Sequence, residues 1–379
     1  MSEKKNNRKI MLAGGGTGGS VTPLLVVAEE LLKEDKNLEI VFVGTKNGVE
    51  RKMLANFSSQ IKYLSLPSGK WRRYFSVHNI LDIFKIFFAF LKSFSLLRQE
   101  RPAIIVTAGS FVAVPLVWAA AFYKIPVLVH QQDIRPGLAN KLMAPLARVI
   151  TVTFEKSLVD YGPKAVLTGN PTKNFFASED VIKIREKYNL KPDLPFVLVT
   201  GGGTGASVIN DLVAEALPNL LSFCQIINLT GQGKHPEIAK KIKPELEQFI
   251  GSYQAIEFVE SKEFINLLRA ADLIVSRCGL SALTEIAFYA KPAILIPIPH
   301  SHQEDNADFF RDKKAAIVLD QEQLSAKSLS AEIKTVLENE KLRAELSDNI
   351  SQSMKPAGAE NITAIIWKII NYKNNEEAD

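Results

Sequence analysis

The sequence predicts an α/β protein with two doubly wound parallel sheets, and three observations carry this prediction. Short apolar runs alternate with helix-length segments along almost all of the 379 residues, a rhythm typical of parallel sheets. Two of these runs lead into glycine-rich loops, Gly14–Gly19 and Gly201–Ala206, which favours two Rossmann-like domains. A turn-rich stretch after the first series places the expected boundary between residues 168 and 169.

The expected strands are the short apolar runs. In the first domain, residues 1–168, they are Ile10–Ala13, Ile40–Val43, Tyr63–Leu66, Ile104–Val106, Val127–Val129, Val149–Val152 and Ala165–Leu167. In the second domain, residues 169–379, they are Phe196–Thr200, Gln225–Asn228, Ala255–Phe258, Leu273–Val275, Ala293–Ile296 and Ala316–Val318. Open α/β sheets bind ligands at the carboxyl ends of such strands, so the loops that follow them are the expected sites.

One charge-free segment, Pro102 to Tyr123, is long enough to span a bilayer. Its first part has the β-branched composition of a strand, and Pro115 suits the first turn of a helix. We therefore expect a buried strand, loop and helix rather than a membrane span. The basic N-terminus is followed by no signal-peptide pattern, which favours a cytoplasmic protein.

The composition is that of a soluble globular protein, with 46% hydrophobic and 23% charged residues. Two cysteines, Cys224 and Cys278, are too few for a disulfide framework or a cysteine-rich metal site, and we expect both in the core. A net charge of +5 is too mild to imply a nucleic-acid partner. A clustered basic surplus would suit an anionic membrane surface.

The glycine loops are candidate phosphate cradles, because glycines let backbone N–H groups approach an anion at a helix N-terminus. Thr22 and Pro23 fit a cap and a first helical position after the first loop. Dinucleotide binding requires a carboxylate after the next strand, and Val43–Thr45 has none. The loops therefore favour a nucleotide or a sugar phosphate over an oxidoreductase cofactor, although glycines also serve tight strand–helix packing.

The segment Ser276–Glu285 follows a strand and opens a helix. Gly279 allows a tight turn, Ser281 is the expected cap, and the nearby N–H groups are suited to a diphosphate. Glu285 lies about one turn inside the helix, where its carboxylate could accept ribose hydroxyl bonds. The alternative is an acidic residue that the helix dipole simply favours at this position.

Two further loops carry polar side chains. Gln303 and Asn306 share a helix face and could bond sugar hydroxyls. His300 and His302 have no clear third ligand, so no metal is expected. Asp133 is the best carboxylate of the first domain for acid–base chemistry, the alternative being a loop aspartate that caps a helix.

The segment Lys70–Arg98 combines basic side chains with more apolar surface than one core-facing side requires. This composition suits a membrane interface, and the alternative is a helix buried by the sheet. The residues expected at that interface are Trp71, Arg72, Arg73, Phe84, Phe87, Phe88 and Lys92.

Taken together, these segments resemble the MurG family of bacterial transferases. The resemblance runs in order through nearly the whole chain, on Gly15–Gly19, His130–Asp133, Gly169–Pro171, Gly201–Ala206, Glu257–Phe258, Ser276–Glu285 and His302–Ala307. It implies a GT-B glycosyltransferase fold, in which two Rossmann-like domains face a cleft and the final helix returns to the N-terminal domain. It also implies an inverting transfer of N-acetylglucosamine from UDP-N-acetylglucosamine to the 4-hydroxyl of the N-acetylmuramic acid of lipid I, which gives lipid II for peptidoglycan.

The resemblance also implies roles for individual residues. On the acceptor side, Thr17, Gly18 and Gly19 match a loop for the lipid-linked diphosphate. On the donor side, the matching positions are Lys173 and Gly203 near the phosphates, Phe258 and Val259 at the uracil, Leu280, Ser281, Ala282, Leu283 and Thr284 at the phosphate-binding turn, Glu285 at the ribose and Gln303 at the sugar. The family implies no cofactor and a peripheral location on the cytoplasmic face of the cell membrane, with Lys70–Arg98 in the docking region.

Three positions depart from the family pattern. Ser20 stands where the family usually has a histidine that is a candidate base, Asp133 stands where it often has asparagine, and Lys173 replaces arginine. Because serine cannot take a proton at neutral pH without a neighbouring base, we expect Asp133 as the general base and Ser20 as an orienting residue. No Asp-x-Asp metal motif is present, so Arg277 and Lys173 are expected to help stabilise the leaving diphosphate.

Three alternatives stay open at this point. The chain could be another UDP-sugar-dependent lipid glycosyltransferase of the same fold. It could be a UDP-sugar epimerase, although the predicted cleft offers few of the carboxylates and histidines that such chemistry needs. It could also be a non-catalytic homologue that binds a UDP-sugar or a lipid. The serine at position 20, where the family usually has a candidate base, motivates this alternative.

Overall fold

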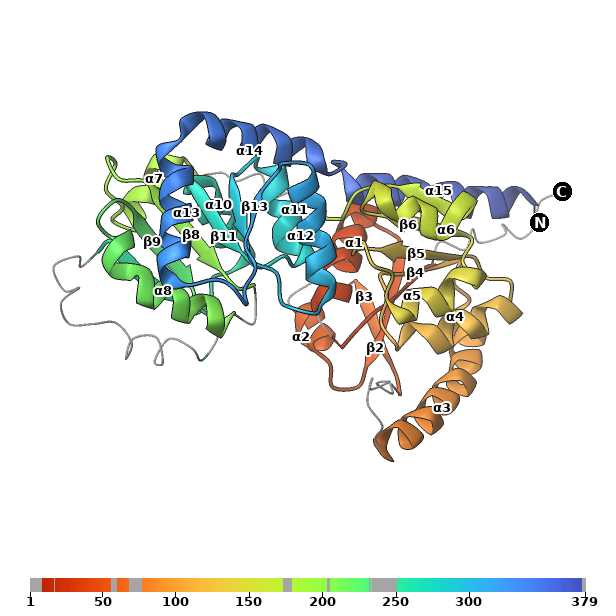
Figure 1. Ribbon diagram of the computed structural model, residues 1–379. Coiled ribbons are helices and arrows are strands. Elements are labelled where there is room, and N and C mark those ends of the chain that lie inside the picture. Colours follow the sequence, from red (N-terminus) through yellow and green to blue (C-terminus); the bar gives the residue numbers. More distant parts are fainter. Residues whose placement is uncertain are drawn as a thin grey trace. The chain divides into compact units, whose positions relative to one another are not determined.

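The computed structural model describes residues 9–16, 18–55, 60–67, 77–172, 179–202, 205–231, 233 and 251–376. They form two compact α/β units (Figure 1). Unit 1 comprises Met1–Lys173 and Lys355–Asp379, and unit 2 comprises Asn174–Met354. The first unit therefore extends past the expected boundary and also includes the C-terminal helix.

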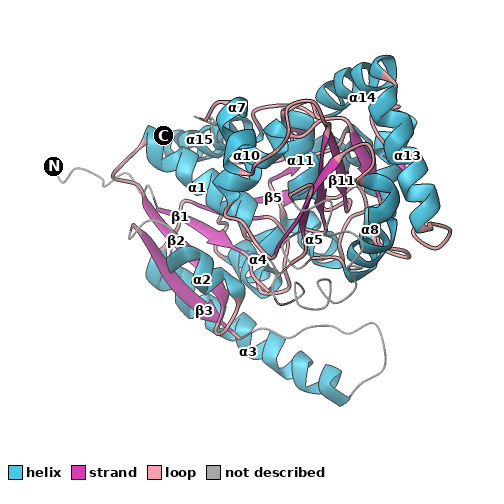
Figure 2. Cartoon of the chain, turned by 90° about the vertical axis from the view of Figure 1, so that its left-hand side faces the viewer, coloured by secondary structure: helices cyan, strands magenta, loops and turns pink. Residues whose placement is uncertain are grey.

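Unit 1 is built on a seven-stranded sheet of order β3-β2-β1-β4-β5-β6-β7, in which every pairing is parallel. The strands are β1 (Lys9–Ala13), β2 (Glu39–Thr45), β3 (Ile61–Leu66), β4 (Ile104–Thr107), β5 (Val127–Gln131), β6 (Val149–Val152) and β7 (Ala165–Leu167). Figure 2 shows β1, β2 and β3 as neighbours. The order reverses at β1, so the loops after β1 and β4 flank the position at which such sheets bind ligands.

Helices cover both faces of this sheet. They are α1 (Thr22–Glu34), α2 (Val49–Ala55), α3 (Val77–Glu100), α4 (Ala113–Phe122), α5 (Leu138–Met143), α6 (Leu158–Tyr161) and α15 (Gly358–Glu376), with short 3₁₀ turns at Gly18–Ser20, Ala144–Leu146, Glu155–Ser157 and Gly162–Lys164. Strand side chains alternate between the faces, so Met11 packs with α3, α4 and α5 while Ile10 packs with α1 and α15.

Unit 2 repeats this plan with a six-stranded parallel sheet of order β10-β9-β8-β11-β12-β13. Its strands are β8 (Phe196–Thr200), β9 (Gln225–Leu229), β10 (Tyr253–Ile256), β11 (Leu273–Ser276), β12 (Ala293–Leu295) and β13 (Ile317–Val318). Its helices are α7 (Val181–Lys187), α8 (Ser207–Leu220), α10 (Ser261–Ala270), α11 (Leu280–Phe288), α12 (His302–Asp312), α13 (Ala326–Glu338) and α14 (Glu340–Ser353). Cys224 and Cys278 are both buried, as expected.

Each predicted strand is present, but three local expectations are wrong. The strand expected at Ala255–Phe258 ends at Ile256, because the chain leaves the sheet there. Val21 rather than Thr22 is the N-cap of α1, with Pro23 in the first turn. Gly279 rather than Ser281 is the N-cap of α11, and no side chain caps that helix.

The uncharged segment Pro102–Tyr123 forms β4, a loop and α4, so the prediction of a strand, loop and helix is confirmed. No helix in the described part of the chain is long and apolar enough to cross a bilayer. The expectation that this segment is buried is wrong for part of α4, where Trp118 and Phe122 are exposed.

The chain returns to unit 1 at Lys355, and the returning segment packs against the Gly169–Pro171 motif. Gly169 has a φ of 81° and lies so close to the Lys355 carbonyl that a Cβ atom would overlap it, which only glycine tolerates. The Asn361 amide then donates to the Thr168 carbonyl at 2.9 Å. From there, α15 lays Ile362, Ile366 and Ile370 on the sheet beside α1 (Figure 1).

We expect Ile366→Ala to destabilise unit 1 by about 2–5 kcal/mol, because it removes a fully buried side chain from this core. Chemical denaturation followed by tryptophan fluorescence measures the effect. The matched control is Ile182→Ala, an exposed isoleucine on α7 of unit 2, which should leave stability nearly unchanged. Equal stabilities of the two variants would contradict the assignment of α15 to the core of unit 1.

Candidate active site

The carboxyl edge of the unit 1 sheet gathers the loops after β1, β4 and β5. The Ser110 hydroxyl, after β4, donates to the Gly15 carbonyl in the first glycine loop at 2.8 Å. Gln132, after β5, donates to the Ala108 carbonyl at 3.3 Å. Side chains therefore join three loops that are far apart in sequence into one polar edge.

Asp133 lies on this edge in a turn that a buried glutamine holds. The Gln131 amide donates to the carbonyls of Asp133 and Arg135, at 2.6 and 3.3 Å. Its oxygen accepts from Asn140 at 2.7 Å and from the Tyr161 hydroxyl at 3.0 Å. With its own hydrogen bonds used in this way, Gln131 fixes the backbone and leaves the Asp133 side chain half-buried.

Ser20 belongs to the short turn Gly18–Ser20 that connects the first glycine loop to α1. Its hydroxyl donates to the Gly15 carbonyl at 3.2 Å, so it shares this acceptor with Ser110. β1 and β5 are separated by β4 alone, which places the Ser20 and Asp133 loops about 10 Å apart along the edge.

His130 is a structural residue, because only 2% of it is exposed and its ring nitrogens face protein atoms. Burial lowers its pKa to about 4, so the ring is neutral at physiological pH. Its nitrogens lie 3.0 Å from the Thr151 hydroxyl and 3.4 Å from the Asn170 side-chain oxygen. His130 thus links β5 to β6 and to the chain crossing near Gly169.

In unit 2, side chains of α12 hold the two loops that follow β11 and β12. The Gln303 side-chain oxygen accepts from the backbone N–H groups of Cys278 and Ile298, at 3.2 and 3.3 Å. The Asn306 amide donates to the Cys278 carbonyl at 3.2 Å. The two residues share a helix face, as expected, but Asn306 is fully buried and supports the loop rather than facing a ligand.

Arg277 is also a supporting residue in this structure. Its guanidinium donates to the carbonyls of Ile296 and Pro297 at 3.0 Å each and to the Gln321 side chain at 2.6 Å. Only 7% of the residue is exposed. The guanidinium of Arg277 is therefore not positioned to contact a leaving diphosphate directly, because these donors already face protein oxygens.

The start of α11 presents backbone rather than side chains. Leu280, Leu283 and Thr284 are buried, and the Thr284 hydroxyl donates to the Leu280 carbonyl at 2.7 Å. Ser281 is exposed and Ala282 is partly exposed. With no side chain at the cap, the first N–H groups of α11 form the kind of helix terminus that binds anions.

Glu285 follows on the same helix. It is half-buried, and burial raises the pKa of its carboxyl to about 7. A carboxyl group that titrates near neutral pH at the carboxyl edge of a sheet is a candidate functional group rather than an ordinary surface charge.

Phe258 and Val259 follow β10, so they lie at the same carboxyl edge of the unit 2 sheet as the loop before α11. Phe258 is 55% exposed although it is a large aromatic residue, and Val259 is partly exposed. The neighbouring loop after β9 is tied to this segment, because Gly231 donates to the Glu257 carbonyl at 3.0 Å. An exposed aromatic side chain can bind the face of a planar ring.

Several predicted residues lie outside the described part of the chain. They are Thr17, Trp71, Arg72, Arg73, Lys173 and Gly203, together with the side chain of Phe84. Gly18 and Gly19 are described and lie in the turn before α1. His300 and His302 are exposed, and within the described ranges no three acidic, histidine or cysteine side chains gather as they would around a metal ion.

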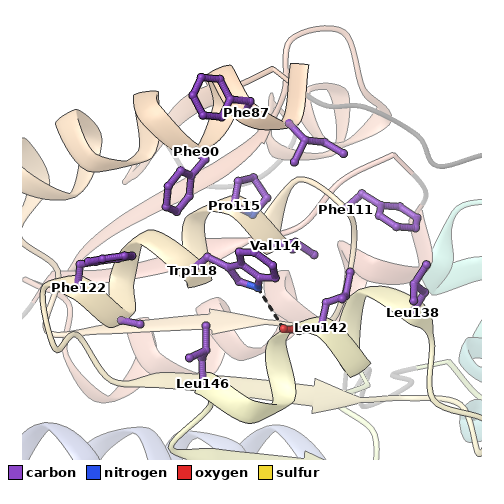
Figure 3. A pocket seen from close by; sticks show the side chains of 12 residues that line it. Phe87, Phe90, Phe111, Val114, Pro115, Trp118, Phe122, Leu138, Leu142 and Leu146 are labelled. Atoms are coloured by element: carbon purple, nitrogen blue, oxygen red, sulfur yellow. Dashed lines mark hydrogen bonds between the residues drawn. The ribbon is translucent and has the colours of Figure 1, made fainter. Parts of the chain in front are cut away.

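An apolar pocket of about 780 Å³ lies between α3, α4 and α5 of unit 1 (Figure 3). Phe87 and Phe90 of α3 face Trp118 and Phe122 of α4 across it, and leucines of α5 and its following turn line the opposite side. Phe88 is exposed nearby at 61%, and Lys92 is exposed and donates to the Ser65 carbonyl. Sequence reasoning missed the α4 and α5 contributions, because isolated apolar residues on those helices carry no signal of exposure.

Comparison with known proteins identifies the family. Residues 10–152 match the glycosyltransferase family 28 N-terminal domain, and residues 196–362 match the C-terminal domain of that family. A protein of Clostridium botulinum (strain Langeland) named UDP-N-acetylglucosamine--N-acetylmuramyl-(pentapeptide) pyrophosphoryl-undecaprenol N-acetylglucosamine transferase is 35% identical, over 92% of this chain and 95% of that protein. A protein of Clostridium tetani with the same name is 33% identical, over 93% of this chain and 96% of that protein.

A solved structure supports the same assignment at the level of the fold. The crystal structure of Acinetobacter baumannii MurG matches with a TM-score of 0.75 at 24% identity, and the match covers 95% of this chain and 99% of that one. The predicted fold class and the resemblance stated from the motifs are thereby confirmed. Matched by both domain models in order, the chain belongs to glycosyltransferase family 28 and is a glycosyltransferase.

Proposed function

We propose that this enzyme transfers N-acetylglucosamine from UDP-N-acetylglucosamine to lipid I and so forms lipid II for peptidoglycan. The observation that carries the proposal is the carboxyl edge of the unit 2 sheet, along which the uncapped start of α11, the half-buried carboxyl of Glu285 and the exposed Phe258 lie. These groups match a diphosphate, a ribose and a planar base. The names of the relatives that cover more than nine tenths of the chain supply the sugar and the acceptor.

The donor occupies unit 2 in this proposal. The N–H groups at the start of α11 hold the diphosphate, because the helix dipole and unpaired donors both favour an anion there. Glu285 accepts the ribose hydroxyls, and the Phe258–Val259 segment lies against uracil. Gln303 holds the backbone of both neighbouring loops and keeps its NH₂ group for a sugar oxygen, whereas Arg277 supplies buried positive charge without direct contact.

The acceptor occupies the glycine-loop edge of unit 1. Its 4-hydroxyl attacks the anomeric carbon of the donor sugar, the bond from that carbon to the UDP oxygen breaks, and the configuration inverts. Asp133 takes the hydroxyl proton, and Ser20 orients the acceptor. UDP leaves as a stabilised diphosphate, with Lys173 and Gly203 as further donors and without a cofactor or a metal ion.

Attachment to the cytoplasmic face of the membrane completes the proposal, because lipid I is a membrane lipid. The apolar pocket of α3, α4 and α5, with exposed Phe87 and Phe88 and the basic Lys92, forms the docking surface. Such a surface inserts aromatic rings at the interface and sets cations against anionic headgroups.

The deciding experiment is turnover of UDP-N-acetylglucosamine with a short-chain lipid I analogue. Release of UDP coupled to a disaccharide product supports the proposed transfer. Transfer to a different lipid acceptor alone would assign another transferase activity. UDP-sugar binding without any turnover would assign the non-catalytic alternative, and conversion of the donor without an acceptor would assign an epimerase.

Donor binding should depend on the ionised form of Glu285. Because its pKa is about 7, the charged fraction falls as the pH is lowered from 8 to 6, and the affinity for UDP-N-acetylglucosamine should fall roughly tenfold. Glu285→Gln should bind the donor about 1.5–3 kcal/mol more weakly at pH 8 and should flatten the profile. Calorimetry measures both, with Glu215→Gln on α8 as the control. An unchanged affinity would return Glu285 to a purely structural position.

Asp133→Asn should lower kcat by roughly 10²–10⁴-fold, the usual loss when a general base is removed. Donor affinity should change little, because the side chain lies in the other unit. Steady-state kinetics with the lipid I analogue measure the loss, and Ser20→His added to this variant should restore part of it. Near-normal turnover of Asp133→Asn would exclude this carboxylate as the base.

Replacing the exposed rings of α3, in the double variant Phe87→Ala/Phe88→Ala, should weaken binding to anionic vesicles by about 1.5–3 kcal/mol for each ring that inserts fully. Co-sedimentation measures binding, and activity on a soluble acceptor should survive. Tyr372→Ala is the control, because Tyr372 is equally exposed but lies on α15, which packs on the opposite face of the sheet. Equal effects of both changes would refute this docking surface.

A further inference from the structure

A fully buried carboxylate, Glu50, lies behind the first glycine loop, and the reaction described above does not use it. It is the second residue of α2, and none of its surface is exposed. One carboxylate oxygen accepts from the backbone N–H of Gly16 at 3.1 Å. The other accepts from the backbone N–H and the hydroxyl of Thr45, at 2.6 and 2.5 Å. Glu50 thus ties the loop after β1 to the end of β2.

The backbone around the Glu50 carboxylate leaves room for this side chain. A Cβ atom at Gly15, Gly44 or Gly48 would overlap the Glu50 side chain, so three glycines leave the room that it occupies. Burial alone would raise its pKa, but the hydrogen bonds from Thr45 and Gly16 outweigh this effect and lower it. Glu50 is therefore held as an anion inside the protein, which is costly unless donors surround it.

The same peptide group is held from its other side. The N–H that Glu50 binds and the carbonyl of Gly15 belong to one peptide unit, and that carbonyl accepts from Ser110 at 2.8 Å and from Ser20 at 3.2 Å. Ser110 has a φ of 90°, a strained conformation for a residue other than glycine, which persists only where its surroundings require it. Loops after β1, β2 and β4 therefore converge on a single peptide group.

We propose that Glu50 and Ser110 are positioning residues that clamp the Gly15–Gly16 peptide, and that the acceptor diphosphate binds to N–H groups beyond it, among them those of Gly18 and Gly19. The inference rests on the proposed acceptor site. Because Glu50 accepts from the Gly16 N–H, that group is not available to the anion. The clamp also fixes the orientation of the loop amides beyond this peptide. A preorganised set of amides binds an anion without paying for loop ordering.

Calorimetry with a short-chain prenyl diphosphate, on the full chain, tests the clamp. Glu50→Gln keeps the shape but turns an NH₂ group toward a backbone donor, so the dissociation constant should rise tenfold or more. Ser110→Ala should raise it several-fold. Because both act on one peptide group, the double variant should weaken binding by less than the product of the single effects. UDP affinity should stay unchanged in all three variants.

A matched control separates positioning from loss of stability. Glu100 is likewise a buried, hydrogen-bonded carboxylate of unit 1, but it pairs with Lys9 and Lys62 near the amino ends of their strands. Glu100→Gln should lower the melting temperature at least as much as Glu50→Gln and leave prenyl diphosphate binding unchanged. Equal weakening by both variants would reduce Glu50 to a stabilising group and overturn the proposal.

The outcomes for the clamp and for the proposed function are distinguishable. The wild-type protein could bind the prenyl diphosphate, and Glu50→Gln could weaken that binding, while no sugar is transferred to lipid I. This result would refute the proposed function and leave the clamp standing. Sugar transfer with binding that neither Glu50→Gln nor Ser110→Ala changes would refute the clamp and leave the function. No wild-type binding of the probe, or fully multiplicative effects of the two changes, would also refute the clamp.

Discussion

The parallel pairing of β1 between β2 and β4 is the constraint on which the first unit depends. Because all three strands run the same way, their following loops leave from one edge. The strand order reverses at β1, so the helices that follow β1 and β4 lie on opposite faces and leave space between their loops. Side-chain hydrogen bonds then convert that space into a defined polar edge, as the contact of Ser110 with Gly15 shows.

Both units hold the loops at their candidate ligand edges with polar side chains that are buried or partly buried. Gln131 and Glu50 do this in unit 1, and Gln303 and Asn306 do it in unit 2. Each of these side chains binds backbone groups that regular secondary structure leaves unpaired. A buried polar group of this kind is expensive when it loses its partner, so it fixes one loop conformation strongly.

The two faces of the unit 1 sheet also differ in how fully their helices are covered. The face with α1 and α15 is closed by the isoleucines of the returning helix. The face with α3, α4 and α5 keeps exposed aromatic rings around a pocket, although the sheet beneath it is packed just as fully. Apolar side chains beyond those needed to cover the sheet are what a second apolar surface, such as a lipid bilayer, would bury.

The sequence by itself determined the strands, the two-sheet plan and the family, because alternating short apolar runs and glycine loops are local patterns. It also singled out Glu285 and Gln303 as candidates, since each lies on the helix that follows a strand end. Only the tertiary structure decided that Arg277 and Asn306 face protein oxygens, that Phe122 is exposed and that Glu50 reaches Gly16. Burial and hydrogen bonding depend on residues brought together from distant strands, and neither periodicity nor spacing along one chain encodes those distances.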